Sequence, residues 1–312
     1  MMEIYQNIET LPIFQNAVIT IGTFDGVHLG HLKVIQQLTE EARKANGVSI
    51  LITFYPHPKQ IVGYENKILY TLNSPEEKYM LLEKTGIEKL VVVPFDKSFS
   101  DLSAEEYISN FLVKKFNPKT IIIGYDHRFG KNRSGNYELL QKHSENYGYT
   151  VKEIPEHILK DITISSTAIR NALLNGEVKI ANTYLGYNYF FSGKVIEGHK
   201  IGRTIKFPTA NIEITDNHKL IPKNGVYVAN VKIEGEDSFL KGMMNIGTRP
   251  TFYDTERHIE VHLFDFNGDL YNKTLTVHIV DRIRDEMRFA NADELKNQLE
   301  KDEKSAKKIF LS

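Results

Sequence analysis

The spacing of apolar residues changes once along this chain, near residue 182, and this change limits the folds open to it. Before residue 182, short apolar runs alternate with segments whose apolar residues follow helical spacing. After it, apolar and polar residues alternate with a period of two. The first pattern is typical of parallel strands with crossover helices, and the second of antiparallel strands with one buried face. The sequence therefore predicts two domains, residues 1–182 and 183–312.

The first half is predicted to be an α/β doubly wound, Rossmann-like domain. Its apolar runs predict strands over 17–24, 48–54, 89–95, 119–124 and 150–154. Helical spacing and capping residues predict helices over 31–45, 74–86, 103–115 and 136–147. Ligands of such sheets bind at the carboxyl ends of the strands, so chemistry is expected in the loops that follow the apolar runs.

The second half is predicted to be a small antiparallel β-barrel followed by a terminal helix. Strand-like runs cover 189–196, 226–233, 239–246, 258–264 and 275–283, and helical spacing covers 291–310. In the fourth run Ile259, Val261 and Leu263 share one face, and Glu260 and His262 share the other. A strand of this kind buries one face and leaves the other for solvent or a ligand.

Charge and composition exclude several classes of function. Lys plus Arg is 39 and Asp plus Glu is 40, so the chain lacks the basic excess typical of nucleic-acid binding. It contains no cysteine, which excludes disulfides, thiolate metal sites and cysteine nucleophiles and fits a reducing compartment. No segment is long and apolar enough to span a bilayer, and the first residues do not resemble a signal peptide. We therefore expect a cytoplasmic protein that binds neither nucleic acid nor membrane.

The segment GTFDGVHLGH, residues 22–31, is the first candidate site. It lies between a predicted buried strand and an amphipathic helix. Its glycines, which include Gly22 and Gly30, allow a tight turn and a close approach of the backbone to a ligand. His28 and His31 stand at the start of the helix, where backbone N–H groups favour an anion such as a phosphate. A capped surface loop remains an alternative, whereas two histidines without cysteine are too few for a confident zinc site.

Three further segments of the first half fall at predicted strand ends or helix starts. ISSTAIR, residues 164–170, offers hydroxyls and an arginine suited to phosphates, although it also fits an ordinary helix cap. TFYPHP, residues 53–58, and GYDHRFG, residues 124–130, each follow an apolar strand. The last two segments are therefore expected at the ligand-binding edge of the sheet.

The second half carries its own candidate site around GRTIKFPTAN, residues 202–211. Thr209 and Asn211 within it are oxygen ligands of the kind that Mg²⁺ prefers. Glu260 lies on the polar face of its strand, where a carboxylate can act as a general base or simply be solvated. The segment RIRDEMRF, residues 282–289, contains an aromatic residue that can stack on a planar ligand.

Taken together, these segments resemble the bacterial bifunctional riboflavin kinase/FAD synthetase family. The first half is similar to its FMN adenylyltransferase module over about residues 15–180, through an HxGH signature of the nucleotidylyltransferase superfamily. The second half is similar to its riboflavin kinase module over about residues 185–305. The resemblance implies that riboflavin is phosphorylated to FMN and that FMN is adenylylated to FAD with release of pyrophosphate. ATP, riboflavin and FMN would be the substrates, with Mg²⁺ as the cofactor.

The resemblance also implies roles for individual residues. His28, His31 and Glu260 would be catalytic. ATP and its phosphates would be held by Gly22, Phe24, Gly30, Ser165, Ser166, Thr167, Arg170 and Arg203. The flavin would be bound by His57, Asp126, Arg284, Glu286 and Phe289, and the metal by Thr209 and Asn211.

The chain departs from the family pattern at three places. The family often has Phe where this chain has His127, and often an acidic residue near Gln60. It usually has Gly where this chain has Lys206, and a position that needs a positive φ would make lysine costly. Two alternatives therefore stay open, namely an adenylyltransferase with an altered kinase half, and a flavin- or nucleotide-binding regulator without catalysis. The sequence leaves the oligomeric state open.

Overall fold

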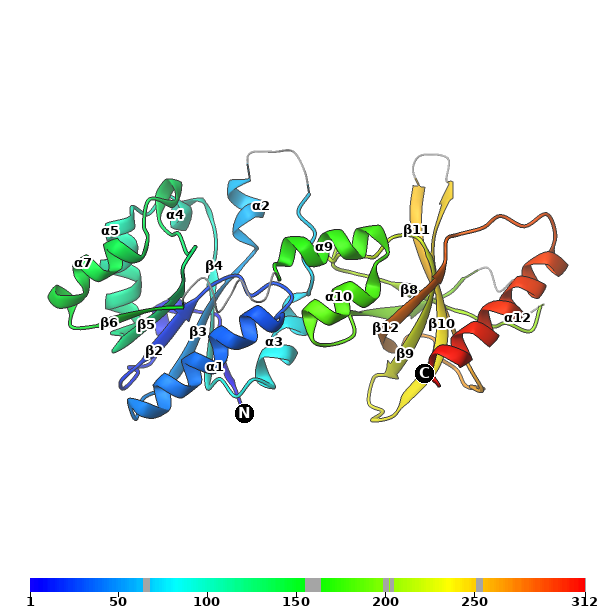
Figure 1. The fold of residues 1–312 in the computed structure, drawn as a ribbon, viewed down its shortest axis with the longest axis horizontal. Helices are drawn as coiled ribbons and strands as arrows, with labels where there is room; N and C mark the ends of the chain where they lie inside the picture. The colour runs from blue at the N-terminus through cyan, green and yellow to red at the C-terminus, as the bar shows by residue number, and fades with distance from the viewer. Residues whose placement is uncertain (64–67, 155–163, 199–201, 203–204, 251–254, 312) are drawn as a thin grey trace. The chain divides into compact units, whose positions relative to one another are not determined.

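A computed structural model describes residues 1–63, 68–154, 164–198, 202, 205–250 and 255–311. The chain forms two compact units, Met1–Ser166 and Thr167–Ser312. Each unit is built around its own sheet (Figure 1). The predicted fold class is confirmed, with a parallel sheet and helices in the first unit and a closed antiparallel barrel in the second.

The first unit contains a six-stranded sheet in the order β1-β4-β3-β2-β5-β6. All its pairs are parallel. The strands are β1 (Glu3–Tyr5), β2 (Val18–Ile21), β3 (Ser49–Tyr55), β4 (Lys89–Pro94), β5 (Thr120–Gly124) and β6 (Thr150–Ile154). β2 is shorter than the predicted run, because the chain turns into a loop at Gly22. The strand β1 was not predicted, since its three residues carry no apolar run.

Helices cover both faces of this sheet, as parallel pairing requires. α1 (Leu29–Lys44) and α3 (Pro75–Glu83) bury Ile35, Leu38 and Leu82 against one face. The other face is covered by α7 (Tyr137–Tyr147) and by the segment of α5 (Ala104–Glu106), the π-helical η2 (Tyr107–Val113) and α6 (Lys114–Phe116). The remaining short helices are η1 (Ile8–Thr10), α2 (Pro58–Val62), α4 (Lys97–Ser100) and η3 (Lys131–Arg133).

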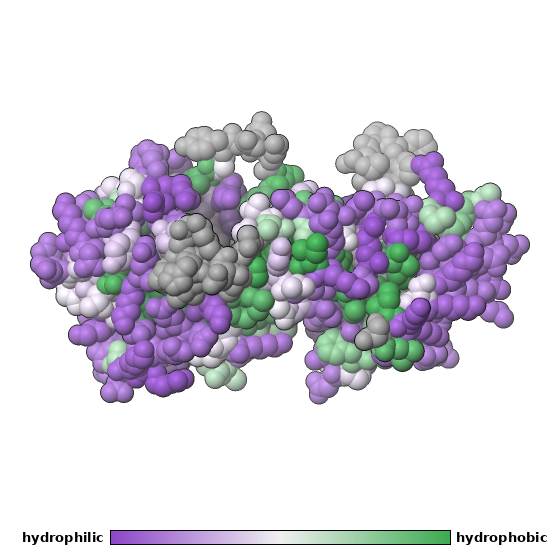
Figure 2. All heavy atoms as spheres, viewed as in Figure 1, coloured by the Kyte–Doolittle hydropathy of each residue, from purple (hydrophilic) through white to green (hydrophobic). Residues whose placement is uncertain are grey.

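The second unit is a closed barrel in the order β10-β11-β8-β7-β12-β9. Its strands are β7 (Phe190–Ile196), β8 (Ala210–Glu213), β9 (Gly225–Ile233), β10 (Phe239–Pro250), β11 (Thr255–Leu263) and β12 (Thr274–Arg284). α12 (Ala292–Ile309) packs Ala306 and Leu295 over Val228, Met243 and Phe264, and hydrophilic residues form its outward side (Figure 2). β8 was not predicted, because four residues after a proline are too few to show a period of two.

Two helices precede the barrel, α9 (Ser166–Asn175) and α10 (Val178–Leu185). The Asn182 side chain ties α10 to the barrel strands. Its amide donates to Ile279 O at 2.9 Å, and its carbonyl accepts from Tyr189 N at 2.8 Å. Lys223 N also donates to Leu173 O of α9 at 3.0 Å. Residues before 183 therefore help to hold the second unit together.

Candidate active sites

The loop after β2 is held open by backbone conformations that few residues adopt. Phe24 and Val27 have φ of 48° and 38°, and Gly26 has 88°. Left-handed conformations cost a non-glycine residue about 1–2 kcal/mol each, so neighbouring contacts must fix this loop. Those contacts converge on Thr23, whose carbonyl accepts from Thr53 Oγ1 at 3.1 Å and from Lys78 Nζ at 3.0 Å.

The two histidines of the loop form a stacked pair at the start of α1. His28 is the N-cap, and its Nδ1 accepts from His31 N–H at 3.3 Å. The ring centroids lie 3.6 Å apart with 18° between the planes. Gly30 leaves room for this pair, because a Cβ there would lie 3.1 Å from the His28 ring. The Phe24 ring lies 5.0 Å from the His31 ring.

The environment of His31 holds it neutral. Burial lowers its pKa well below the ordinary value, and the neighbouring His28 and Lys78 lower it further. Its Nδ1 is buried and makes no hydrogen bond within the described residues. A polyanion bound at the start of α1 would raise the pKa of His31 and so oppose the lowering by His28 and Lys78.

Asp25 joins the loop to two distant segments. Its Oδ1 accepts from Leu72 N at 2.8 Å, just before α3, and its carbonyl accepts from Ser166 Oγ at 2.8 Å. Ser166 of the ISSTAIR segment therefore contacts the GTFDGVHLGH loop, and Ser165 is exposed. Arg170 follows one helical turn later on the same face of α9.

Lys78 was missed by sequence reasoning. It lies on α3, four residues before the fully buried Leu82, and therefore on the inner face of that helix. Burial lowers the pKa of its ammonium group, and Asp25 opposes this shift. That helical spacing was the available signal, because a lysine on a buried face needs a partner.

The other predicted segments lie at the ends of neighbouring strands. β3, β2 and β5 are adjacent in the sheet, so their carboxyl ends share one edge. His57 caps α2 through Nδ1, which accepts from Lys59 N at 3.1 Å, and Gln60 completes the capping box. Asp126 is exposed after β5. Tyr55 and Tyr125 are exposed at the same strand ends, and each offers an aromatic surface to a planar ring.

His127, at the position where the family pattern suggests phenylalanine, is half-buried, and its Nε2 atom is fully buried. Burial lowers its pKa to about 4, against the opposing effect of Asp126, and Arg133 and Arg128 lower it further. Its Nε2 makes no hydrogen bond within the described part of the chain. Its ring lies 5.9 Å from the Phe129 ring. The imidazole therefore occupies an aromatic position as a neutral ring.

We expect His127→Phe to weaken the pH dependence of stability. The unfolded chain takes up a proton near pH 6.5 and the folded chain only near pH 4, so unfolding becomes easier as the pH falls between these values. The loss is about 1.4 kcal/mol per pH unit, and phenylalanine removes it. Urea unfolding at pH 7 and pH 5 measures the effect. An equal fall for wild type and variant would contradict it.

In the second unit, the strand pairing brings the predicted kinase residues together. Glu260 on β11 lies opposite Asn211 on β8 and opposite Asn245 on β10. Thr209 Oγ1 donates to Glu260 Oε2 at 3.4 Å. A Cβ at Gly198 would overlap the Asn211 carboxamide, so this glycine keeps room for the amide. Asn245 was not predicted, and its register opposite Glu260 is what places it in the site.

Residues of the segment 284–289 contact two different parts of the second unit. Arg284 makes a bidentate ion pair with the buried Asp302 of α12, with Nε and NH2 within 3.1 Å of its oxygens. Arg284 also lies 5.9 Å over the Phe289 ring. Glu286 instead accepts from Asn224 Nδ2 at 3.4 Å. Arg203 lies outside the described residues.

Lys206 has a φ of 67°, the left-handed conformation that favours the glycine expected from the family pattern. We expect Lys206→Gly to stabilise the second unit by about 0.5–1 kcal/mol, because the left-handed strain exceeds the extra entropy of an unfolded glycine. Lys206→Ala keeps the strain and should give no gain. Urea unfolding separates the two variants.

The same pair of variants tests whether the Lys206 charge contacts phosphate. Both should then raise the ATP KM of riboflavin phosphorylation without abolishing turnover. An unchanged ATP KM in both would limit Lys206 to a structural position. A wild type that makes no FMN, beside a glycine variant that does, would show that lysine inactivates the kinase half.

The parallel sheet of the first unit and the barrel of the second define a two-module class of nucleotide-dependent transferase. Two family models match the chain, FAD synthetase over residues 11–168 and riboflavin kinase over residues 185–310. The chain belongs to the bifunctional riboflavin kinase/FMN adenylyltransferase family. The predicted family resemblance is thus confirmed.

Curated relatives carry that family name and match nearly the whole chain. The protein of Buchnera aphidicola subsp. Schizaphis graminum is 39% identical, covering 99% of both chains. That of Escherichia coli K12 is 39% identical over 95% of this chain and 93% of its own. That of Bacillus subtilis 168 is 37% identical over 94% and 92%.

A solved structure from Streptococcus pneumoniae matches the whole fold. It is described as a macrolide-efflux protein, and it superposes with a TM-score of 0.86 at 32% identity, covering 98% of each chain. Within the described residues of the present chain, no helix is long and apolar enough to cross a membrane.

Proposed function

We propose that this chain converts riboflavin to FAD in two ATP-dependent steps, with phosphorylation in the second unit and adenylylation in the first. The observation that supports this proposal is that a pair or cluster of candidate residues lies together in each unit. His28 and His31 stack at one helix start, and Thr209, Asn211 and Glu260 meet across β8 and β11. The family membership supports both activities.

In the adenylylation step, a phosphate oxygen of FMN attacks the α-phosphorus of ATP. The new P–O bond forms FAD, the bond to the bridging oxygen breaks, and pyrophosphate leaves. No enzyme nucleophile is needed, so rate comes from positioning and charge stabilisation. His28 accepts at Nδ1, which puts the proton of the neutral ring on Nε2 as a donor to phosphate. Ser165, Ser166, Thr167 and Arg170 bind the phosphates beside it.

The strand ends of the same sheet edge would bind the rest of the substrates. Gly22, Phe24 and Gly30 would contribute to ATP binding from the same loop, in which Gly30 makes room for the His28 ring and Phe24 packs against His31. His57 and Asp126 lie at the ends of β3 and β5 and bind FMN, with the exposed Tyr55 and Tyr125 as surfaces on which its ring can stack.

In the kinase step, the ribityl 5′-hydroxyl attacks the γ-phosphorus of ATP. Glu260 accepts the hydroxyl proton as the general base, the bond to the bridging oxygen breaks, and ADP leaves. Glu286 and Phe289 bind the flavin, Arg284 holds their segment to α12 through Asp302, and Arg203 completes the ATP contacts.

Magnesium fits the second site. Thr209 and Asn211 offer a hydroxyl and an amide oxygen, and Mg²⁺ prefers few protein oxygens completed by phosphates and water. Within the described residues there is no cluster of three His, Asp or Glu that could hold a metal without substrate. When bound, the ion would neutralise phosphate charge, and Thr209 and Asn211 would hold it beside Glu260.

We further propose that the enzyme works in the cytoplasm on small molecules and binds neither nucleic acid nor membrane. The net charge of −1 and the absence of cysteine support this.

We place the functional boundary at residues 182/183. A fragment 1–182 keeps α9 for adenylylation, and a fragment 183–312 keeps the kinase residues. We expect both fragments to be active, with 183–312 melting below a longer 167–312 piece because it loses the Asn182 hydrogen bonds. An unfolded 183–312, or a fragment active only when the other is added, would reject this boundary.

One assay tests the function as a whole. The chain is incubated with riboflavin, ATP and Mg²⁺, and the flavins formed are identified by chromatography. FMN followed by FAD supports the proposal. FAD formed only when FMN is supplied indicates an adenylyltransferase with an altered kinase half. Neither product, with flavin still bound, indicates a regulator.

A further inference from the structure

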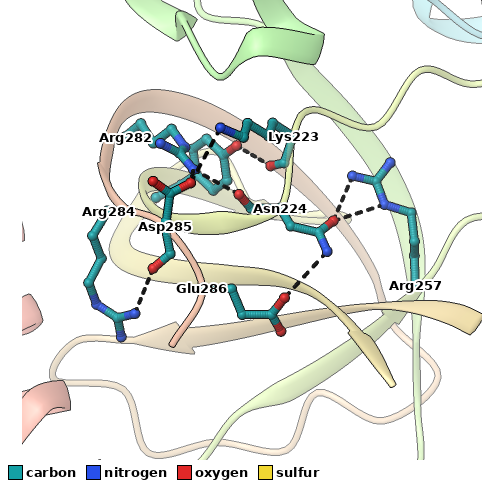
Figure 3. Close-up of polar contacts among 8 residues, drawn as sticks. Lys223, Asn224, Arg257, Arg282, Arg284, Asp285 and Glu286 are labelled. Atoms are coloured by element: carbon teal, nitrogen blue, oxygen red, sulfur yellow. Dashed lines mark hydrogen bonds and ion pairs between the residues drawn. The ribbon is translucent and has the colours of Figure 1, made fainter. Parts of the chain in front are cut away.

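Arg257 on β11 holds the segment 221–224 that leads into β9. Its NH1 donates to Ile221 O at 3.0 Å, and its NH2 donates to Pro222 O. Nε and NH2 both donate to Asn224 Oδ1, at 3.3 and 3.0 Å (Figure 3). The guanidinium fork thus binds two carbonyls and one amide oxygen, which a lysine ammonium cannot match with the same geometry.

These contacts set the orientation of the Asn224 amide. Arginine is only a donor, so the amide oxygen must face Arg257 and the NH2 group must face away. Asn224 Nδ2 accordingly lies 3.4 Å from Glu286 Oε2 and 3.4 Å from Thr248 Oγ1. A rotated amide would place two oxygens against each other, and Glu286 would lose its donor.

Glu286 lies close to Asn245, which is the cross-strand partner of the predicted base Glu260. Its carboxylate and the Asn245 amide both lie over Gly247, where a Cβ would overlap Glu286 Oε1. Asn245 pairs with Glu260 across β10 and β11. The chain of contacts from Arg257 through Asn224 therefore ends beside the kinase site.

A second set of contacts fixes the same segment from the other side. Arg282 NH2 donates to Asn224 O at 2.8 Å and pairs with Asp285 at 2.6 Å. Lys223 Nζ lies 3.4 Å from the same carboxylate, and these cations hold the pKa of Asp285 below its ordinary value. Arg282 thus holds the backbone carbonyl of Asn224, whereas Arg257 holds its side-chain amide and the two carbonyls before it.

We propose that Arg257 is a positioning residue for riboflavin: through Asn224 it holds the Glu286 carboxylate in the orientation that binds the flavin. The proposal rests on the assignment of Glu286 to the flavin site and deepens it. We expect Arg257 to act on riboflavin affinity rather than on the transfer step, because its hydrogen bonds lead through Asn224 to Glu286, which is assigned to the flavin and not to the reacting atoms.

The test is steady-state riboflavin phosphorylation by the full chain. We expect Arg257→Met and Arg257→Lys to raise the riboflavin KM about tenfold, the effect of losing one hydrogen bond to a charged group. The kcat and the ATP KM should stay within about twofold of wild type. Lys232→Met, which removes an exposed ion pair with Asp237, is the matched control and should change none of these values.

Asn224→Asp tests the amide orientation directly. Aspartate keeps an oxygen for Arg257 but turns a second oxygen toward Glu286 in place of the donor. We expect the same rise in riboflavin KM. If Arg257→Met lowers the melting temperature, Asn224→Asp provides the test in its place. A normal riboflavin KM in both variants would overturn the proposal.

Glu286→Gln separates this proposal from the assignment on which it rests. If Arg257 acts through Glu286, adding Arg257→Met to Glu286→Gln should raise the riboflavin KM no further. Additive effects of the two substitutions on the riboflavin KM would show that Arg257 does not act through Glu286, while leaving Glu286 in the flavin site. A normal riboflavin KM in Glu286→Gln would show that Glu286 does not bind the flavin, and the proposed role of Arg257 would then be rejected as well. A wild-type chain that makes no FMN would instead reject the proposed kinase function.

Discussion

His28→Ala and His31→Ala should each abolish FAD formation from supplied FMN, while FMN formation from riboflavin continues. The two rings stack at the N-terminus of α1, so each variant removes a neighbour of the other as well as a contact to phosphate. Losing one electrostatic stabiliser costs on the order of 10²–10³ in rate. The measurement is pyrophosphate and FAD production at saturating ATP and FMN.

The matched control is His143→Ala, a histidine of α7 in the same unit that pairs with Glu105 at 2.6 Å. It should leave the adenylylation rate within a few-fold of wild type. Because His31 packs against Phe24, a thermal melt must accompany the rates. Near-normal FAD synthesis in both HxGH variants, with folded protein, would remove these histidines from the active site.

Elements with a sustained hydrophobic pattern could be predicted from the sequence. β3, β4 and β5 are buried on both faces and contain continuous apolar runs, which is the signature of a central parallel strand. α1 and α12 show helical periodicity, because one side faces a core. β1 and β8 lacked such a pattern, since strands of three and four residues are defined by their partners and not by their own sequence.

Some residues of the candidate sites could likewise be proposed from the sequence, and others could not. Motif residues such as His28 and Glu260 could be proposed from the sequence, because their spacing is tied to a strand–loop–helix or strand context. Lys78 lies near the first candidate site because α3 packs against the loop, and Asn245 lies near the second because of its cross-strand register. Neither relation can be read from the sequence alone. The conformation of Lys206 is an intermediate case. The glycine expected from the family pattern suggests a positive φ, and only the structure shows that Lys206 has one.

Glu260→Gln should give the opposite result to the histidine variants: riboflavin phosphorylation is lost and adenylylation of supplied FMN survives. Glutamine keeps the shape and the contact with Thr209 but cannot accept the hydroxyl proton. Removing a general base costs about 10²–10⁴ in rate. If phosphorylation continues near the wild-type rate, Glu260 is a structural residue.

Gly198→Ala provides an independent test of the same site without altering any charge. Its new Cβ would overlap the Asn211 carboxamide, and because that amide ends a short flexible side chain, it can move without unfolding the barrel. We expect the riboflavin kinase rate to fall, and raised Mg²⁺ to restore part of it if Asn211 holds the metal. For Glu260→Gln, added Mg²⁺ should restore nothing, because the missing proton acceptor is not a metal ligand. Rescue of both variants by Mg²⁺, or of neither, would contradict this division of roles between Asn211 and Glu260.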